Sequence, residues 1–117
     1  TANDLLSARK EALNVRVNEA VLGYISDLGA ATRNHEKIRL GLSTRGLIAL
    51  KKMSQAYAAV RGMEFVNPEC VKAVAPYVIP HRLVCRELSL SLSKKSAAEE
   101  ITEQLLDTVP VPTEKIG

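Results

Sequence analysis

Apolar residues recur at helical spacing in the segment that follows Asn18. Four of them lie at positions i, i+3, i+4 and i+7, which puts them on one face of an α-helix. They are Val21, Tyr24, Ile25 and Leu28. Asn18 is a residue type that often caps a helix N-terminus through its side-chain oxygen. The pattern therefore predicts a helix that begins after Asn18 and ends near Arg33 or Asn34.

A longer apolar stripe follows Ser43. Its members are Leu47, Leu50, Met53, Tyr57 and Ala58. Ser43 is a favourable N-cap, and Gly62 is placed as the glycine that follows a helix C-terminus. We therefore predict a long helix from Ser43 to about Arg61, with the stripe facing the core.

Two later helices are indicated by their first residues. Asn67-Pro68-Glu69 combines an N-cap, a proline at the first helical position and an acid in the first turn. Pro76 falls inside the apolar period of this helix, so we expect a break or kink near Ala75. The capping box formed by Ser96 and Glu99 predicts a last helix that runs through Leu106.

The remaining segments complete the predicted fold. Residues 3–13 form a first helix, residues 35–42 form a loop, and residues 82–93 alternate in polarity and are extended. The fold class is therefore all-α, a small helical bundle of about five helices with short extended connectors. Residues 1–112 are expected to form one domain, and residues 113–117 a tail.

The composition fits one small helical domain. The chain has 117 residues, of which 46% are hydrophobic and 25% charged, and it has only one Phe and three Tyr, so its core is aliphatic. It contains no apolar run of the ~18–20 residues that span a bilayer and no signal-peptide segment, so we expect a cytoplasmic protein. Because the first residue is Thr1 and not Met, we expect a segment of a longer protein.

Two cysteines, Cys70 and Cys85, lack CxxC spacing. This pattern predicts buried or semi-buried thiols in a cytoplasmic protein and leaves any redox role open. A zinc site made of Cys70, His81 and Cys85 is a weaker alternative, since it has three ligands at an unusual spacing.

The positive charge is concentrated in one segment. The net charge is +3, but residues 33–52 contain six Lys or Arg residues against one acid, Glu36. Within this segment, Gly41 and Gly46 have the G-x-x-x-x-G spacing of a P-loop. Leu47 and Ile48 stand where the P-loop needs Lys and Ser or Thr, so the catalytic part of that motif is missing.

Arg45 lies at the second helical position if Ser43 is the N-cap. A cation is mildly unfavourable there, because the helix dipole is positive at this end. The first turn also has unpaired N–H groups that attract anions, and an arginine adds a planar, permanently charged donor for phosphate. The residues alone leave two interpretations open, an anion-binding arginine and a solvated surface arginine.

Several motifs together resemble the C-terminal lid domain of MoxR-type AAA+ ATPases. That family has a T-R pair near a helix end, then G-x-S-P-R-A, A-x-x-x-G-R-x-x-V-x-P-x-D-V and V-L-x-H-R segments. The matching stretches are Thr32-Arg33, "GLSTRG" (41–46), "AVRGMEFVNPECV" (59–71) and "VIPHR" (78–82), with Val17, Tyr24 and Ile25 also fitting. The resemblance runs from about Val15 to "VPVP" (109–112).

This resemblance implies a lid that closes over ATP and Mg²⁺ bound to a separate core domain. Arg45 would be the sensor-2 arginine that contacts the terminal phosphate, and Ser43 would cap the phosphate-facing turn. The expected partners are the protein's own AAA+ core domain, neighbouring subunits of a hexameric ring, and client protein complexes remodelled in a chaperone-like way. The segment itself has no Walker motif, so we expect it to hold no catalytic residue, no metal and no cofactor of its own.

The chain departs from the family pattern at four positions. They are Thr44 for proline, Gly46 for alanine, Met63 for arginine and Cys70 for aspartate. The first two should loosen the first turn of the helix, because proline presets φ and glycine is a poor helix former. The last two remove an Arg–Asp pair together, which suggests a lost structural bridge.

Two other functions stay open at this point. One is a small helical nucleic-acid-binding module that uses residues 33–52, although we expect no specific nucleic-acid binding because few aromatics lie there to stack on bases. The other is a protein-interaction module with no nucleotide role. The His81-Arg82 pair is interpreted as structural or inter-domain, since no nucleophile or partner acid accompanies it.

Overall fold

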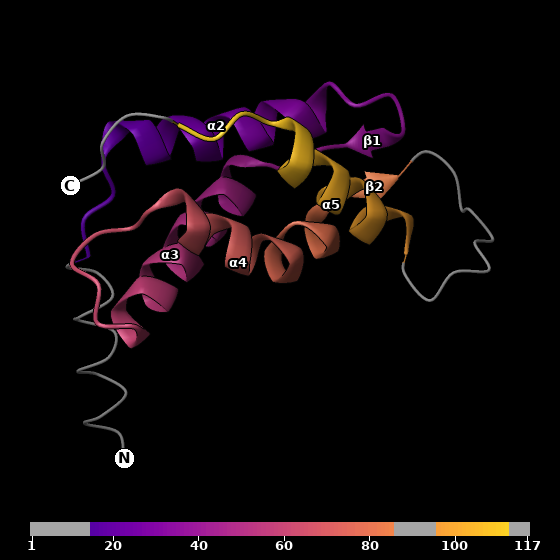
Figure 1. The fold of residues 1–117 in the computed structure, drawn as a ribbon. Coiled ribbons are helices and arrows are strands. Elements are labelled where there is room, and N and C mark those ends of the chain that lie inside the picture. Colours follow the sequence, from indigo (N-terminus) through magenta and orange to yellow (C-terminus); the bar gives the residue numbers. More distant parts are fainter. Residues whose placement is uncertain (1–14, 86–95, 113–117) are drawn as a thin grey trace, which may run out of the picture.

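The computed structural model describes residues 15–85 and 96–112. In chain order the elements are α2 (Glu19–Arg33), β1 (Ile38–Leu40), α3 (Thr44–Val60), α4 (Pro68–Val78), the 3₁₀ helix η1 (Pro80–Arg82), β2 (Val84–Cys85) and α5 (Ala97–Thr108). Figure 1 shows α3 and α4 beneath α2, with α5 near the two short strands. The predicted all-α class is confirmed, with four α-helices in the described part and the predicted helix over 3–13 outside it.

All four helices begin at the N-caps that the sequence predicted. In each case the cap's side-chain oxygen accepts a hydrogen bond from a backbone N–H of the first turn, at 2.9–3.2 Å. The capping residues are Asn18, Ser43, Asn67 and Ser96. Gly62 follows the end of α3 with a φ of 71°, the left-handed conformation expected of a C-terminal glycine.

The core lies between α2, α3 and α4. The predicted stripe of α2 is buried throughout, with exposed fractions of 4% or less. On α3, Leu50 and Ala58 are buried as predicted, but Met53 is 45% exposed, so its assignment to the core was wrong. Ser54 takes the buried position instead, and its hydroxyl donates to the carbonyl of Leu50 at 2.7 Å, which satisfies the polar group inside the core.

Pro76 does not break α4. The helix continues to Val78, and the N–H of Ile79 donates to the carbonyl of Ala75 at 2.9 Å. The predicted break near Ala75 was therefore wrong, whereas a kink there stays a prediction. Pro76 is exposed and lies in the last turn, so its missing N–H removes one hydrogen bond on the outer side of a helix that ends soon afterwards.

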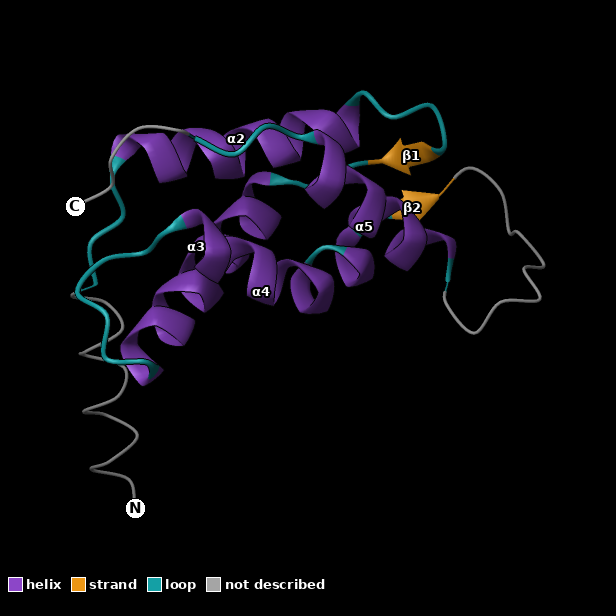
Figure 2. Ribbon diagram, viewed as in Figure 1, coloured by secondary structure: helices purple, strands orange, loops and turns teal. Residues whose placement is uncertain are grey.

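The segment 35–42 was predicted as a loop but contains strand β1. It pairs antiparallel with β2, and the two strands lie side by side in Figure 2. In this pairing Ile38 faces Cys85 and Leu40 faces Val84. Ile38 is buried against two side chains of α5, Ile101 and Leu105, and this apolar contact holds the short ribbon to the bundle.

Two contacts fix the segment that leads into α2. The amide Nε2 of Gln55, in the middle of α3, donates to the carbonyl of Val15 at 2.9 Å. Arg16 pairs with the α3–α4 connection, because its N–H donates to Glu64 and its carbonyl accepts from Val66. The leading segment is thus attached to both α3 and the chain that follows it.

Candidate functional site

The first turn of α3 carries the two residues that the sequence singled out. Ser43 has an extended backbone, and its Oγ accepts from the N–H of Gly46 at 3.2 Å. Arg45 is exposed at the second helical position and makes no hydrogen bond or ion pair within residues 15–85 and 96–112. The first turn contains no acid, so nothing on the helix itself neutralises this arginine.

Two backbone donors of the same turn are also unused. In the described part of the chain, the N–H groups of Thr44 and Arg45 have no acceptor, since the intrahelical ladder begins at Leu47. Unpaired N–H groups at a helix start carry partial positive charge and can donate to a phosphate oxygen. The turn therefore offers an anion two N–H groups and a guanidinium.

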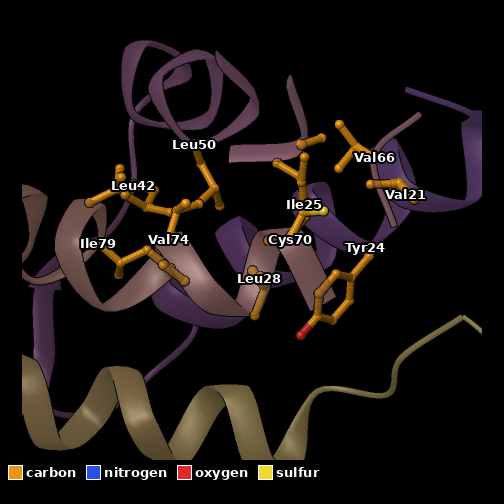
Figure 3. Packing of buried hydrophobic residues seen from close by; sticks show 14 of the residues in the cluster. Val21, Tyr24, Ile25, Leu28, Leu42, Leu50, Val66, Cys70, Val74 and Ile79 are labelled. Carbon is orange, nitrogen blue, oxygen red and sulfur yellow. The ribbon is translucent and has the colours of Figure 1, made fainter. Parts of the chain in front are cut away.

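Leu42, the residue before the N-cap Ser43, is held by its side chain and by both of its backbone polar groups. Leu42 is 1% exposed, and its side chain lies among those of Leu50, Val74 and Ile79, as Figure 3 shows. Its N–H donates to Oγ1 of Thr32 at 2.9 Å. Its carbonyl accepts from Nη1 of Arg33 at 2.9 Å. Sequence reasoning identified the Thr32-Arg33 pair as a motif, but it did not predict these contacts.

Because Gly41 has no side chain, the backbone before α3 can pack directly against the backbone of α2. A Cβ atom at this position would lie 2.7 Å from the N of Arg33 and 2.8 Å from its Cα and from the carbonyl carbon of Thr32. These neighbours are backbone atoms and cannot swing aside. Only glycine fits here without moving α2 away from the start of α3.

Arg82 lies beside the same turn. Its Cδ would be 3.5 Å from a Cβ built on Gly46, and the Cδ2 of Leu42 would be 2.9 Å from that atom. Gly46 is therefore packed under Leu42 and next to Arg82. Despite the glycine and Thr44, the predicted loosening has not prevented the Ser43 cap from forming. Sequence reasoning missed the position of Arg82, because it is 36 positions after Gly46 and no local signal links them.

The two cysteines have separate surroundings. Cys70 is buried at the start of α4, with its Sγ 3.8 Å from Sδ of Met63, whereas Cys85 is half-buried on β2. Both thiols are free. Among the residues described, no three His, Cys, Asp or Glu side chains gather where they could hold a metal ion, so the alternative of zinc at Cys70, His81 and Cys85 is not supported.

The side chain of Tyr24 places a polar group in the core without a partner among the described residues. The hydroxyl of Tyr24 is inaccessible to solvent and makes no hydrogen bond to the described residues. Burial raises the pKa of this phenol above its ordinary 10.0, and the negative charge of Glu69 raises it further.

The bundle and its capped, arginine-bearing turn correspond to a known class. The chain belongs to the AAA lid domain family, whose model matches residues 30–104. More narrowly, it is a lid domain of a MoxR-like AAA+ ATPase. The assignment of all of 1–112 to this domain, with 113–117 as a tail, remains a prediction.

Three proteins show the similarity. The chain is 32% identical to the uncharacterized protein YeaC of Bacillus subtilis and 29% identical to the chaperone MoxR1 of Mycobacterium tuberculosis, and each match covers 96% of this chain. A crystal structure of a candidate ATPase from Cytophaga hutchinsonii covers 95% of the chain at 28% identity, with a TM-score of 0.81. The chain spans about a third of the length of each, between 32% and 36%.

None of the helices in the part described is both long enough and apolar enough to cross a membrane.

Proposed function

We propose that this lid closes over ATP bound to an AAA+ core domain and that Arg45 is its sensor-2 residue, in contact with the terminal phosphate. The observation that carries the proposal is the exposed guanidinium of Arg45, which has no partner among the described residues and lies in a turn without an acid. An arginine at this end of a helix is electrostatically unfavourable on its own, by ~0.3–1 kcal/mol. A phosphate placed against the turn would attract both the guanidinium and the positive end of the helix dipole, which makes the net electrostatic energy of the turn favourable.

The donor set of the turn fits a phosphate. The free N–H groups of Thr44 and Arg45 and the guanidinium lie within one helical turn, and Ser43 fixes that turn by accepting from Gly46. Arginine presents a planar set of donors that matches two phosphate oxygens at once. ATP and Mg²⁺ would be held by the core domain, and these residues would bind only the outer phosphate oxygens.

The wider role follows from the family. A lid that contacts ATP in its core domain would change its position when the terminal phosphate is cleaved, and it would pass that change to neighbouring subunits of a ring, expected to be a hexamer. The similarity to a protein named as a chaperone supports remodelling or assembly of client protein complexes as the output. No residue of this segment is proposed as catalytic.

The test is ATP turnover by the complete ATPase that carries this lid. Arg45→Ala should lower turnover at least tenfold, since arginines that face transferred phosphoryl groups are worth ~10³–10⁵ in rate. Arg45→Lys should restore little, because a lysine lacks the planar fork. Arg39→Ala is the matched control, an exposed arginine of the same basic segment on β1, and should leave turnover unchanged.

Thermal melts separate a lost contact from a lost fold. Arg45 is exposed, so truncating it opens no cavity, and the free energy of unfolding should change by within ~0.5 kcal/mol. Wild-type turnover in Arg45→Ala would exclude the sensor-2 role. A large fall in melting temperature would instead make Arg45 a structural residue.

A further inference from the structure

Thr32 is buried and holds two backbone groups at once. Its Oγ1 donates to the carbonyl of Gly29 at 2.6 Å and accepts from the N–H of Leu42 at 2.9 Å. A hydroxyl has one proton, and here that proton is directed to Gly29, so a lone pair is left for Leu42. The side chain thus joins the last turn of α2 to the segment before α3, in a place that is 0% exposed.

Arg33 completes the contact from the next position. Its Nη1 donates to the carbonyl of Leu42 at 2.9 Å. Both backbone polar groups of Leu42 are therefore held by two consecutive residues of α2. The missing Cβ of Gly41 lets the two backbones meet. We call the two hydrogen bonds that Thr32 and Arg33 make to Leu42, together with the close approach of Gly41 to the backbone of α2, the Leu42 clamp.

The Leu42 clamp fixes the orientation in which α3 begins. Leu42 immediately precedes the N-cap Ser43, so rotation of its backbone would swing the first turn of the helix. Apolar contacts already hold α2 against α3, because Leu28 and Leu50 are fully buried in the same cluster. Apolar contacts are non-directional, whereas hydrogen bonds to both backbone groups of one residue fix an orientation.

We propose that Thr32 and Arg33 are positioning residues for Arg45, which hold the first turn of α3 in the orientation that lets its guanidinium reach the terminal phosphate. This inference rests on the proposed function of Arg45. Neither residue contacts the nucleotide in this scheme. Their effect is large because displacement of a reacting group by about 1 Å can cost ~10²-fold in rate.

The decisive experiment is a double-mutant cycle on ATP turnover by the complete ATPase. Thr32→Val keeps the shape of the side chain but removes both hydrogen bonds, and we expect kcat to fall about five- to fifty-fold with KM changed less than about threefold. In an Arg45→Ala background, Thr32→Val should lower kcat by less than about twofold, because the side chain that Thr32 positions is already absent. Thr32→Ser keeps the hydroxyl and should restore most of the rate.

Two controls test whether the loss of kcat comes only from a loss of stability. Thr102→Val deletes an equally buried hydroxyl that donates to Ala98 at 2.7 Å within α5, away from the clamp. It should lower the melting temperature without the loss of kcat. If Thr32→Val fails to fold, Arg33→Ala replaces it, since Arg33 is exposed and its removal opens no cavity. Its matched control is Arg61→Ala, which removes an Nη1 hydrogen bond and a cation–π contact to Tyr57 at the other end of α3.

The outcomes distinguish this inference from the function on which it rests. Wild-type turnover in Arg45→Ala would defeat the sensor-2 role itself. A large loss of turnover in Arg45→Ala, together with normal turnover in Thr32→Val and Arg33→Ala, would support the sensor-2 role of Arg45. It would overturn the positioning role of Thr32 and Arg33. A full-size loss from Thr32→Val in the Arg45→Ala background would also overturn it, because the effect would then not pass through Arg45.

Discussion

The thiol of Cys70 lies 3.8 Å from the thioether sulfur of Met63. These are the two positions at which the resemblance to the family leads us to expect an arginine and an aspartate. The contact joins the α3–α4 connection to the first turn of α4, so two sulfur atoms meet where a charged pair was expected. The sequence-based interpretation that the two changes belong together is therefore supported by their proximity.

The pair can be tested by restoring the charges. Cys70 is 1% exposed, so Cys70→Asp alone would bury a carboxylate without a partner and should cost about 2–4 kcal/mol of unfolding free energy. Adding Met63→Arg should recover at least about 1 kcal/mol, as coupled neighbours do. Chemical denaturation of the two single variants and the double variant measures this coupling. Met53→Arg, at an exposed methionine, serves as a control, and a double variant no more stable than Cys70→Asp would contradict the pairing.

The close approach at Gly41 predicts a cost for a single methyl group. Gly41→Ala should destabilise the protein by about 1–3 kcal/mol, because the new Cβ meets backbone atoms of α2 at 2.7–2.8 Å. Gly23→Ala is the matched control, since its Cβ would meet nothing within 4 Å and it lies inside α2. That change should stabilise by up to about 1 kcal/mol. Equal melting temperatures for the two variants would show that α2 can yield at Gly41.

The unpartnered hydroxyl of Tyr24 predicts that its removal is tolerated. Tyr24→Phe should leave stability unchanged or raise it by up to about 2 kcal/mol, because no hydrogen bond to the described residues is lost. Thermal melts at neutral pH measure the difference. Tyr77→Phe is the control, since Tyr77 is 76% exposed. A loss above about 1 kcal/mol would reveal a partner for this hydroxyl.

The same phenol predicts a pH dependence. Its pKa is raised above 10.0, so the folded state keeps the proton that the unfolded chain releases first as pH rises. The free energy of unfolding should therefore fall with pH above about 10, and less steeply in Tyr24→Phe than in the wild type or in Tyr77→Phe. Denaturation curves over this alkaline range give the slopes. Parallel slopes for all three proteins would contradict the shift.

The isolated 117-residue chain should not hydrolyse ATP and should bind it weakly. One guanidinium and two N–H groups cannot replace a loop that encloses the phosphates, and the P-loop lysine is absent at Leu47. Isothermal titration with ATP and Mg²⁺ measures the affinity. A micromolar dissociation constant, lost again in Arg45→Ala, would show that the lid holds the nucleotide by itself.

The helices could be predicted because their signals are local. A cap such as Asn18 and an apolar period such as that of α2 lie within a few residues of each other, and the structure confirms both. Met53 was misplaced because it lies on the flank of the stripe, where spacing alone does not say which edge of the helix faces the core. Pro76 was misjudged because the cost of a proline depends on exposure and on distance from the helix end.

The helix start at the candidate site was predictable. The structure confirms Ser43 as its N-cap, because capping has a local sequence signal, while the sensor-2 role of Arg45 stays a prediction. The contact of Arg33 with Leu42 was not predictable, since it joins residues on two sides of a loop. The nearness of Arg82 to Gly46 depends on the packing of η1 against α3, and no spacing rule encodes that.

The hydrogen bond from Gln55 to Val15 makes the start of the described chain a mechanical part of α3. Val15 is bonded to α3, and Arg16 is bonded to the connection that leaves this helix. The same helix carries Arg45 in its first turn, at the N-terminal end. A displacement of Val15 would therefore have to break its hydrogen bond to Gln55 or move the helix that carries Arg45.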